Sequence, residues 1–278
     1  MFLKKKHIPI LTYHNICNDP NYLADSHDWI TSAEFHSQLE YLKNSNFTPI
    51  SFSDLLDSNK NLPKKPIILS FDDGYESCYS IIYPLLKEYN FKASFFIFTD
   101  FISGNHTQRK NNDWNIGYRP TTGHLIWPEI HEMIASGLVE IGSHTKTHRS
   151  LTEIDLEEVE NELKESKKVI EDHLKKKIDV FSYPGGHGYD KLSIKNLVKD
   201  SGYLVAASAF PSAIENIKKM DTLALKRVEI NQSVTTNTRG KALAKNKFIT
   251  KVYPRLFFIS KFNSLNWLAN FLIRLASL

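Results

Sequence analysis

The chain has 278 residues, of which 41% are hydrophobic and 24% are charged, values that are ordinary for a globular protein with a sizeable core. Its two cysteines lack metal-binding spacing and are too few for a disulfide framework, and no apolar run approaches the length of a membrane span. The net charge of +4 is uneven, because the chain after Glu229 has eight basic residues and no acidic one.

Seven short apolar runs along the chain are typical of β-strands. They are residues 8–14, 66–73, 93–98, 138–144, 178–184, 203–210 and 223–230. Segments with helix-like patterns lie between them, and these are residues 31–46, 79–90, 127–137, 155–174 and 190–202. This alternation predicts an α/β fold with a parallel sheet, and seven such units favour one barrel over a two-domain chain.

Two segments lie outside this pattern. Residues 100–126 are polar with little periodicity, which is typical of a lid or of a disordered loop. We expect a barrel over residues 1–235 and a basic, amphipathic tail over residues 236–278. The tail either lies on an anionic membrane surface or packs on the barrel. Its apolar residues recur at steps of three or four, at Phe258, Phe262, Leu265, Leu268, Leu272 and Leu275.

The start of the chain, MFLKKK, is basic but is followed by no long apolar segment, so we predict that no secretory signal is present. We therefore expect a cytoplasmic location. If the tail binds lipid, the protein would make peripheral contact with the inner face of the membrane.

Polar residues that are able to bind a metal follow four of the predicted strands. The first strand ends in YH, the second in DDG, the fourth in SHTKTH and the fifth in SYPGGHGYD. Taken singly, HxxxH is common on surfaces, and DDG and YPGG are ordinary turn sequences. Because the carboxyl ends of parallel barrel strands converge, however, their joint placement favours one functional site.

His144 and His148 are spaced i, i+4, which on a helical turn puts both imidazoles on one face. With one carboxylate they would bind a divalent ion and leave positions open, as catalytic rather than structural sites do. One member of the Asp72–Asp73 pair would complete this ligand set. The other, held beside it, would take a proton from the attacking water as a general base.

The stretches SFDDGYES, IGSHTKTHRSL and FSYPGGHGYD resemble, in this order, the motifs of polysaccharide deacetylases of the NodB-homology type, carbohydrate esterase family 4. The resemblance covers roughly residues 8–230 and implies a distorted (β/α)7 barrel. It implies that Asp73, His144 and His148 are the metal ligands and that Asp72 is the catalytic base. The implied metal is zinc, with nickel and cobalt as alternatives.

The N-terminal stretch ILTYHNI resembles the start of exopolysaccharide deacetylases, in which the general-acid histidine precedes the DD motif. That likeness implies that His14 protonates the leaving amine, a role that suits an imidazole near neutral pH. The alternative is a packed histidine at the end of a strand.

The third motif departs from the family pattern. Many members have an arginine there that orients the base, whereas FSYPGG has none, and Arg227 on the seventh predicted strand is the candidate replacement. The resemblance assigns the oxyanion-binding backbone N–H to Gly185, where the missing side chain would let substrate approach. We also expect four residues near the site to contact the substrate, namely Tyr75, Tyr183, Pro184 and His187.

The sequence therefore predicts a metal-dependent hydrolase that removes an N-acetyl group from an amino sugar in a polysaccharide or a lipid-linked glycan. An O-acetyl or N-formyl group is the alternative leaving acyl group. A catalytically inactive, carbohydrate-binding or membrane-associated relative is the competing class of function, favoured by the missing arginine or by the basic tail. No nucleic-acid-binding motif accompanies the basic tail, so no nucleic-acid partner is expected.

Overall fold

The computed structural model describes residues 8–18, 29–108, 123–209, 213–214 and 220–231. The strands are β1 (Ile8–Tyr13), β2 (Asn15–Cys17), β3 (Trp29–Thr31), β4 (Thr48–Pro49), β5 (Pro66–Phe71), β6 (Ala93–Ile97), β7 (Val139–Ser143), β8 (Val180–Ser182), β9 (Val205–Ala207), β10 (Ala213–Ile214) and β11 (Val228–Glu229). The α-helices are α1 (Ser32–Asn44), α2 (Phe52–Leu56), α3 (Tyr83–Tyr89), α4 (Trp127–Ala135), α5 (Leu156–Leu174) and α6 (Leu192–Asp200). Each of the seven strands expected from the sequence contains an observed strand.

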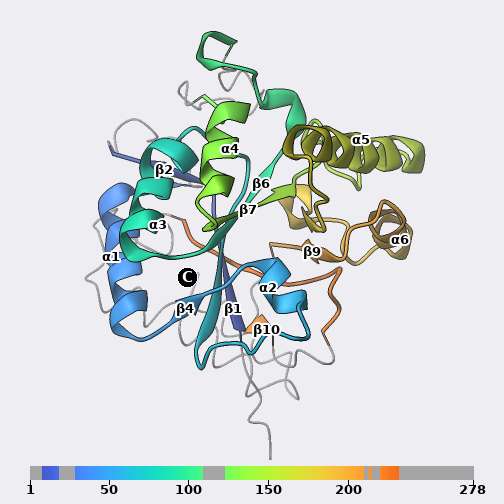
Figure 1. The fold of residues 1–278 in the computed structure, drawn as a ribbon. Helices are drawn as coiled ribbons and strands as arrows, with labels where there is room; N and C mark the ends of the chain where they lie inside the picture. The colour runs from blue at the N-terminus through green and yellow to red at the C-terminus, as the bar shows by residue number, and fades with distance from the viewer. Residues whose placement is uncertain (1–7, 19–28, 109–122, 210–212, 215–219, 232–278) are drawn as a thin grey trace, which may run out of the picture.

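The main sheet is a distorted barrel. Strands β1, β5, β6, β7, β8 and β9 follow one another as parallel neighbours. The segment 225–229 joins the two ends, because Leu225 bridges to Ala207 of β9 and Val228 of β11 pairs with Leu11 of β1. The predicted (β/α) barrel with seven main strands is therefore confirmed, with α1 and α3 to one side of the strands in Figure 1 and α5 and α6 to the other.

Alternation along each strand divides the core into an inner and an outer layer. In β5, Ile68 belongs to the inner hydrophobic cluster, whereas Leu69 and Phe71 pack in the outer cluster against the helices. The next inward positions, Ser70 and Asp72, are polar and buried. The barrel interior is therefore apolar toward the amino ends of the strands and polar at the carboxyl ends.

The short helix α2 contributes to the apolar end of the barrel interior. Its Phe52 and Leu55 join the inner cluster, and the Phe52 ring lies 5.6 Å from that of Phe96 in an edge-to-face arrangement. A capping box begins the helix, because Ser51 Oγ accepts from Asp54 N while the Asp54 carboxylate accepts from Ser51 N. Its five residues were too few for the sequence pattern to predict.

The outer helices follow the predicted periodicity with two exceptions. In α5, Val159, Leu163 and Ile170 lie at helical spacing and are buried, whereas Leu156, the first residue of the helix, is 51% exposed. The predicted helix over 79–90 begins as a π-helix, Cys78–Ile82, and continues as α3. Pro84 follows at the second position of α3, where its ring would crowd the carbonyl four residues earlier in a continuous α-helix.

Several expectations fall on residues that the structure does not describe. The basic start of the chain lies within residues 1–7, most of the proposed lid lies within 109–122, and the amphipathic tail lies within 232–278. The boundary between barrel and tail therefore stays a prediction. No helix among the described residues combines the length and the hydrophobicity that crossing a bilayer requires.

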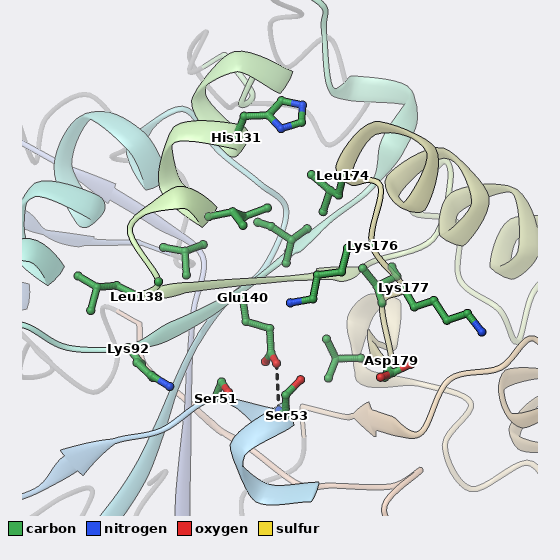
Figure 2. Close-up of a pocket in the computed structure, with 16 residues that line it drawn as sticks. Ser51, Ser53, Lys92, His131, Leu138, Glu140, Leu174, Lys176, Lys177 and Asp179 are labelled. Carbon is green, nitrogen blue, oxygen red and sulfur yellow. Dashed lines mark hydrogen bonds between the residues drawn. The ribbon is translucent and has the colours of Figure 1, made fainter. Parts of the chain in front are cut away.

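A cavity of about 300 Å³ opens at the amino ends of β7 and β8, away from the polar end of the barrel (Figure 2). The two strands pair only at Ser143 and Phe181, near their carboxyl ends, so they separate toward the cavity. Lys176 and Glu140 are among its polar lining residues, and none of the site residues expected from the sequence lines it. The site residues expected from the sequence follow the carboxyl ends of the strands instead.

Glu140 in this cavity is expected to stabilise the fold without affecting function. Its carboxylate accepts hydrogen bonds from Phe52 N and Ser53 N, both at 3.0 Å, and from Ser94 Oγ at 2.6 Å. The Glu140→Ala substitution leaves these donors without their acceptor and should lower the free energy of unfolding by about 1–3 kcal/mol. Urea denaturation measures this, with the exposed Glu153→Ala as control; equal midpoints for the two variants would contradict it.

Candidate active site

Three side chains from the carboxyl ends of two strands converge at the polar end of the barrel. Asp73 follows β5, and His144 and His148 follow β7. One potential ligand atom from each lies within 4.8 Å of the others. Asp73 Oδ1 lies 3.2 Å from His148 Nε2 and 3.5 Å from His144 Nε2. The structure thus brings together the three residues that the family resemblance names as ligands.

The turn after β5 depends on two consecutive residues in the left-handed region. Asp73 has φ of +73° and Gly74 has φ of +65°. A Cβ atom at position 74 would lie 2.8 Å from Ile97 Cγ2, so a side chain there would clash with β6 as well as strain the backbone. Aspartate is one of the few non-glycine residues that tolerate this conformation. The DDG sequence therefore turns the chain while placing both carboxylates at the mouth of the barrel.

The expectation that His144 and His148 lie on a helical turn is wrong. Residues 144–148 leave β7 in an irregular conformation, with φ of +71° at Thr145 and +64° at His148. The loop doubles back, so the two imidazole rings lie with centroids 4.6 Å apart and at 72° to each other. Thr145 Oγ1 accepts a hydrogen bond from His148 N at 3.0 Å and closes the loop.

The protonation of His144 suits a metal ligand. Its Nδ1 lies 2.8 Å from Ser182 O, a carbonyl acceptor, so Nδ1 carries the proton and Nε2 presents a lone pair toward Asp73. Burial lowers the pKa of His144 to about 4, which keeps the ring neutral. Burial acts to raise the pKa of Asp73, but the hydrogen bond with His148 and the nearby imidazoles outweigh it, so this pKa lies well below its usual value. One ionised carboxylate and two imidazoles fit a divalent cation.

Asp72 is held by a buried arginine. Arg227 Nη1 donates to Asp72 Oδ1 at 2.8 Å and Nη2 donates to Asp72 Oδ2 at 2.7 Å, a bidentate pair. The remaining three guanidinium N–H groups donate to Ser70 Oγ, Ser182 Oγ and Ser208 O. All five donors of the side chain are therefore used, which fixes the guanidinium and, through it, the carboxylate. The structure therefore pairs Arg227 with Asp72, and the role of Arg227 in orienting a catalytic base stays a prediction.

This pairing sets the charge of Asp72. Burial alone would raise the pKa of the carboxyl group, but the adjacent Arg227 guanidinium outweighs burial and lowers the pKa below its usual value. Asp72 is 3% exposed and Arg227 is 1% exposed, so solvent screens the pair weakly. The side chain is consequently ionised and able to accept a proton at neutral pH.

His14 lies beside both carboxylates. It follows β1, and the preceding carbonyl, Tyr13 O, accepts from Asp72 N at 2.9 Å. The imidazole is close enough to contribute to the low pKa of Asp72 and of Asp73. Its Nδ1 is buried and has no hydrogen-bond partner among the residues that the structure describes. The structure therefore places His14 at the site, and its role as acid stays a prediction.

The third motif forms a tight turn at the rim of the site. Residues Pro184–Gly186 make one 3-10 turn, in which Gly185 is exposed with φ of +59°. The turn's own bonds use the N–H groups of Gly186 and His187. Within the described part of the chain, no hydrogen bond uses the N–H of Gly185, and it remains the candidate oxyanion donor.

The expectation for the four substrate contacts needs correction. Tyr75 and Tyr183 are fully buried core residues, and Pro184 is buried as well. The Tyr183 hydroxyl donates to Leu223 O at 3.0 Å, and the side chain packs in the outer hydrophobic cluster. Of the four, only His187 has an exposed side chain that a sugar could reach.

Two buried residues at the site were missed by the sequence interpretation. His124 is fully buried with a pKa lowered by burial to about 4, and its Nδ1 lies 3.1 Å from Asp73 O. Glu162 on α5 accepts hydrogen bonds from the loop between His144 and His148. The helical periodicity of α5 contained a signal for Glu162, since it lies between Val159 and Ser166 on the buried stripe. No comparable periodicity surrounds His124.

Comparisons with known proteins agree with this architecture. A family model described as polysaccharide deacetylase matches residues 59–206, more than half of the chain. A Bacillus subtilis protein named "Putative polysaccharide deacetylase YxkH" is 27% identical over 247 residues, covering 88% of this chain and 78% of that protein. The poly-beta-1,6-N-acetyl-D-glucosamine N-deacetylase of Staphylococcus aureus strain MRSA252 is 25% identical over 167 residues, which cover 56% of this chain and 53% of that protein.

A solved structure is also similar. BC0361, a polysaccharide deacetylase from Bacillus cereus, superposes with a TM-score of 0.69 and 25% sequence identity over 89% of this chain and 69% of that chain. The family match contains Asp72, Asp73, His144 and His148, whereas His14 and Arg227 lie outside it. Because the family model matches more than half of the chain, the chain belongs to the polysaccharide deacetylase family.

Proposed function

We propose that the chain is a divalent-metal-dependent hydrolase that removes N-acetyl groups from an amino-sugar polysaccharide. The observation that carries this proposal is the convergence of Asp73, His144 and His148 beside a second carboxylate, Asp72, that is held ionised by Arg227. Asp73, His144 and His148 would hold the ion. A divalent ion in such a site supplies Lewis acidity, which polarises a carbonyl group and makes a water molecule easier to deprotonate.

In the proposed chemistry the two adjacent aspartates have different roles, because Asp73 is a metal ligand and Asp72 is the base. Asp72 takes the proton from the water that attacks the acetyl carbonyl, since it is ionised and Arg227 fixes its orientation. The backbone N–H of Gly185 donates to the developing oxyanion. His14 gives a proton to the departing amine, and acetate is the second product.

The proposed substrate is a polymer of N-acetylated glucosamine. Support comes from the S. aureus relative, whose name gives poly-beta-1,6-N-acetyl-D-glucosamine as its substrate. A lipid-linked amino sugar is the alternative carrier. The expected cytoplasmic location and membrane contact stay predictions, because both depend on segments outside the described residues.

Removal of metal is expected to abolish acetate release. We would strip the purified full chain with dipicolinate, measure acetate from β-1,6-linked N-acetylglucosamine oligomers, and then restore Zn²⁺, Co²⁺ or Ni²⁺ separately. Activity should be lost on stripping and return with at least one ion, because in the proposed mechanism the ion supplies the Lewis acidity. The Asp73→Asn variant should bind the ion weakly and remain inactive after reconstitution, since it lacks the charged ligand.

The controls separate the competing functions. Chitin oligomers in place of β-1,6-linked oligomers test the linkage. Equal acetate release before and after removal of the metal would contradict the metal-dependent mechanism. Tight metal binding without acetate release from any N-acetylated oligomer or lipid-linked sugar would favour the catalytically inactive, carbohydrate-binding relative instead.

A further inference from the structure

A buried carboxylate that the proposed chemistry does not use lies behind the two histidines. Glu162, in the middle of α5, is only 5% exposed. Its Oε2 accepts hydrogen bonds from Lys146 N at 2.9 Å and from Thr147 N at 2.8 Å, and its Oε1 accepts from Thr147 Oγ1 at 2.6 Å. All three donors belong to the loop that joins His144 to His148.

That loop needs an external support. Thr145 and His148 both adopt positive φ although neither is glycine, a conformation that costs energy for any residue with a Cβ atom. In this conformation the N–H groups of residues 146 and 147 both donate to one oxygen, Glu162 Oε2. A carboxylate at Glu162 therefore stabilises this shape of the loop over the relaxed alternatives, and charged acceptors make the stronger hydrogen bonds.

A second position on the same helix supports the other end of the loop. Ser166, one turn after Glu162 on the buried face of α5, lies with its Oγ 2.7 Å from Ser143 Oγ. Ser143 Oγ in turn accepts from Thr145 N at 3.2 Å. The helix thus contacts the loop both where it leaves β7 and just before His148.

We propose that Glu162 is a positioning residue that sets the metal affinity of the site by fixing where His148 lies. Through the loop it keeps His148 Nε2 3.2 Å from Asp73 Oδ1, the separation on which simultaneous binding of one ion depends. The inference rests on the proposed metal site and deepens it. Partners behind metal ligands typically change metal affinity about 10- to 100-fold when they are removed.

The test is a graded series of variants at this contact. Glu162→Met keeps the length of the side chain but removes both acceptors, so its affinity for Zn²⁺ should fall about 10- to 100-fold. Glu162→Gln keeps one oxygen for the two N–H groups, and Thr147→Val removes only the hydroxyl bond, so both should show smaller losses. Isothermal titration with Zn²⁺, and the visible absorption of bound Co²⁺, report affinity and ligand geometry without any assay of activity.

The matched control is Glu165→Met on the same helix. Among the described residues the Glu165 side chain has no hydrogen bond, so this variant should bind Zn²⁺ as the unmodified protein does. If Glu162→Met fails to fold, the Gln and Val variants still carry the test. Metal affinities equal to that of the unmodified protein throughout the series would overturn the role of Glu162. Failure of the unmodified protein and of Glu165→Met to bind any ion would overturn the metal site itself.

Discussion

Replacing Asp72 with asparagine is expected to lower the rate of acetate release about 10²- to 10⁴-fold, the usual contribution of a general base, while metal binding persists. Asparagine has nearly the shape of aspartate but cannot accept a proton at neutral pH. The proposed ligands Asp73, His144 and His148 are untouched. Turnover of the Zn²⁺-loaded protein should therefore fall, whereas the Zn²⁺ dissociation constant should stay the same.

The same comparison checks the division of work between the adjacent carboxylates. Asp73→Asn should lose metal affinity, whereas Asp72→Asn should retain it. If Asp72→Asn lost the ion and Asp73→Asn kept it, the two roles would have to be exchanged. His14→Ala is a third variant for this comparison, since loss of the proposed acid should slow turnover without changing Zn²⁺ affinity.

Replacing Arg227 with methionine is expected to lower the free energy of unfolding by about 3–5 kcal/mol, because it leaves the buried Asp72 carboxylate without its partner. Turnover should fall as well, since the base loses the group that orients it. Urea denaturation and acetate release measure the two effects. The Arg227→Lys variant keeps the charge but loses the bidentate fork, so it should recover part of the stability and little of the rate.

Two controls make the Arg227 result specific. Lys226→Met alters the adjacent exposed position and should change neither quantity. The double variant Asp72→Asn/Arg227→Met should be less destabilised than the sum of the single variants, because the two side chains form one interacting pair. Additive losses would show that Arg227 supports the fold independently of Asp72.

The strand and helix pattern could be predicted from the sequence where local preferences and burial agree. In β5, the apolar run before DDG predicts a buried strand, and Gly74 marks the left-handed turn after it. In α5, the stripe from Val159 to Ile170 predicts the buried face. The secondary structure of such segments can be predicted from their local sequence, without information on distant residues.

The parts of the site that could not be predicted depend on contacts across the fold. The loop from His144 to His148 takes positive φ at two non-glycine residues, which no local preference indicates. Arg227 reaches Asp72 across 155 positions of the chain, so its placement depends on how the barrel closes. Tyr183 belongs to a turn-like sequence but packs in the core, where its hydroxyl donates to the carbonyl of Leu223.

Closure of the barrel by the segment 225–229 also makes the site depend on a distant part of the chain. The three proposed ligands and Asp72 all lie before residue 149, whereas Arg227, the partner of Asp72, lies within the closing segment. A nascent or truncated chain that ended before this segment would lack the guanidinium that orients Asp72. We therefore expect a chain truncated before residue 225 to keep the three proposed ligands but to leave the buried Asp72 carboxylate without its partner.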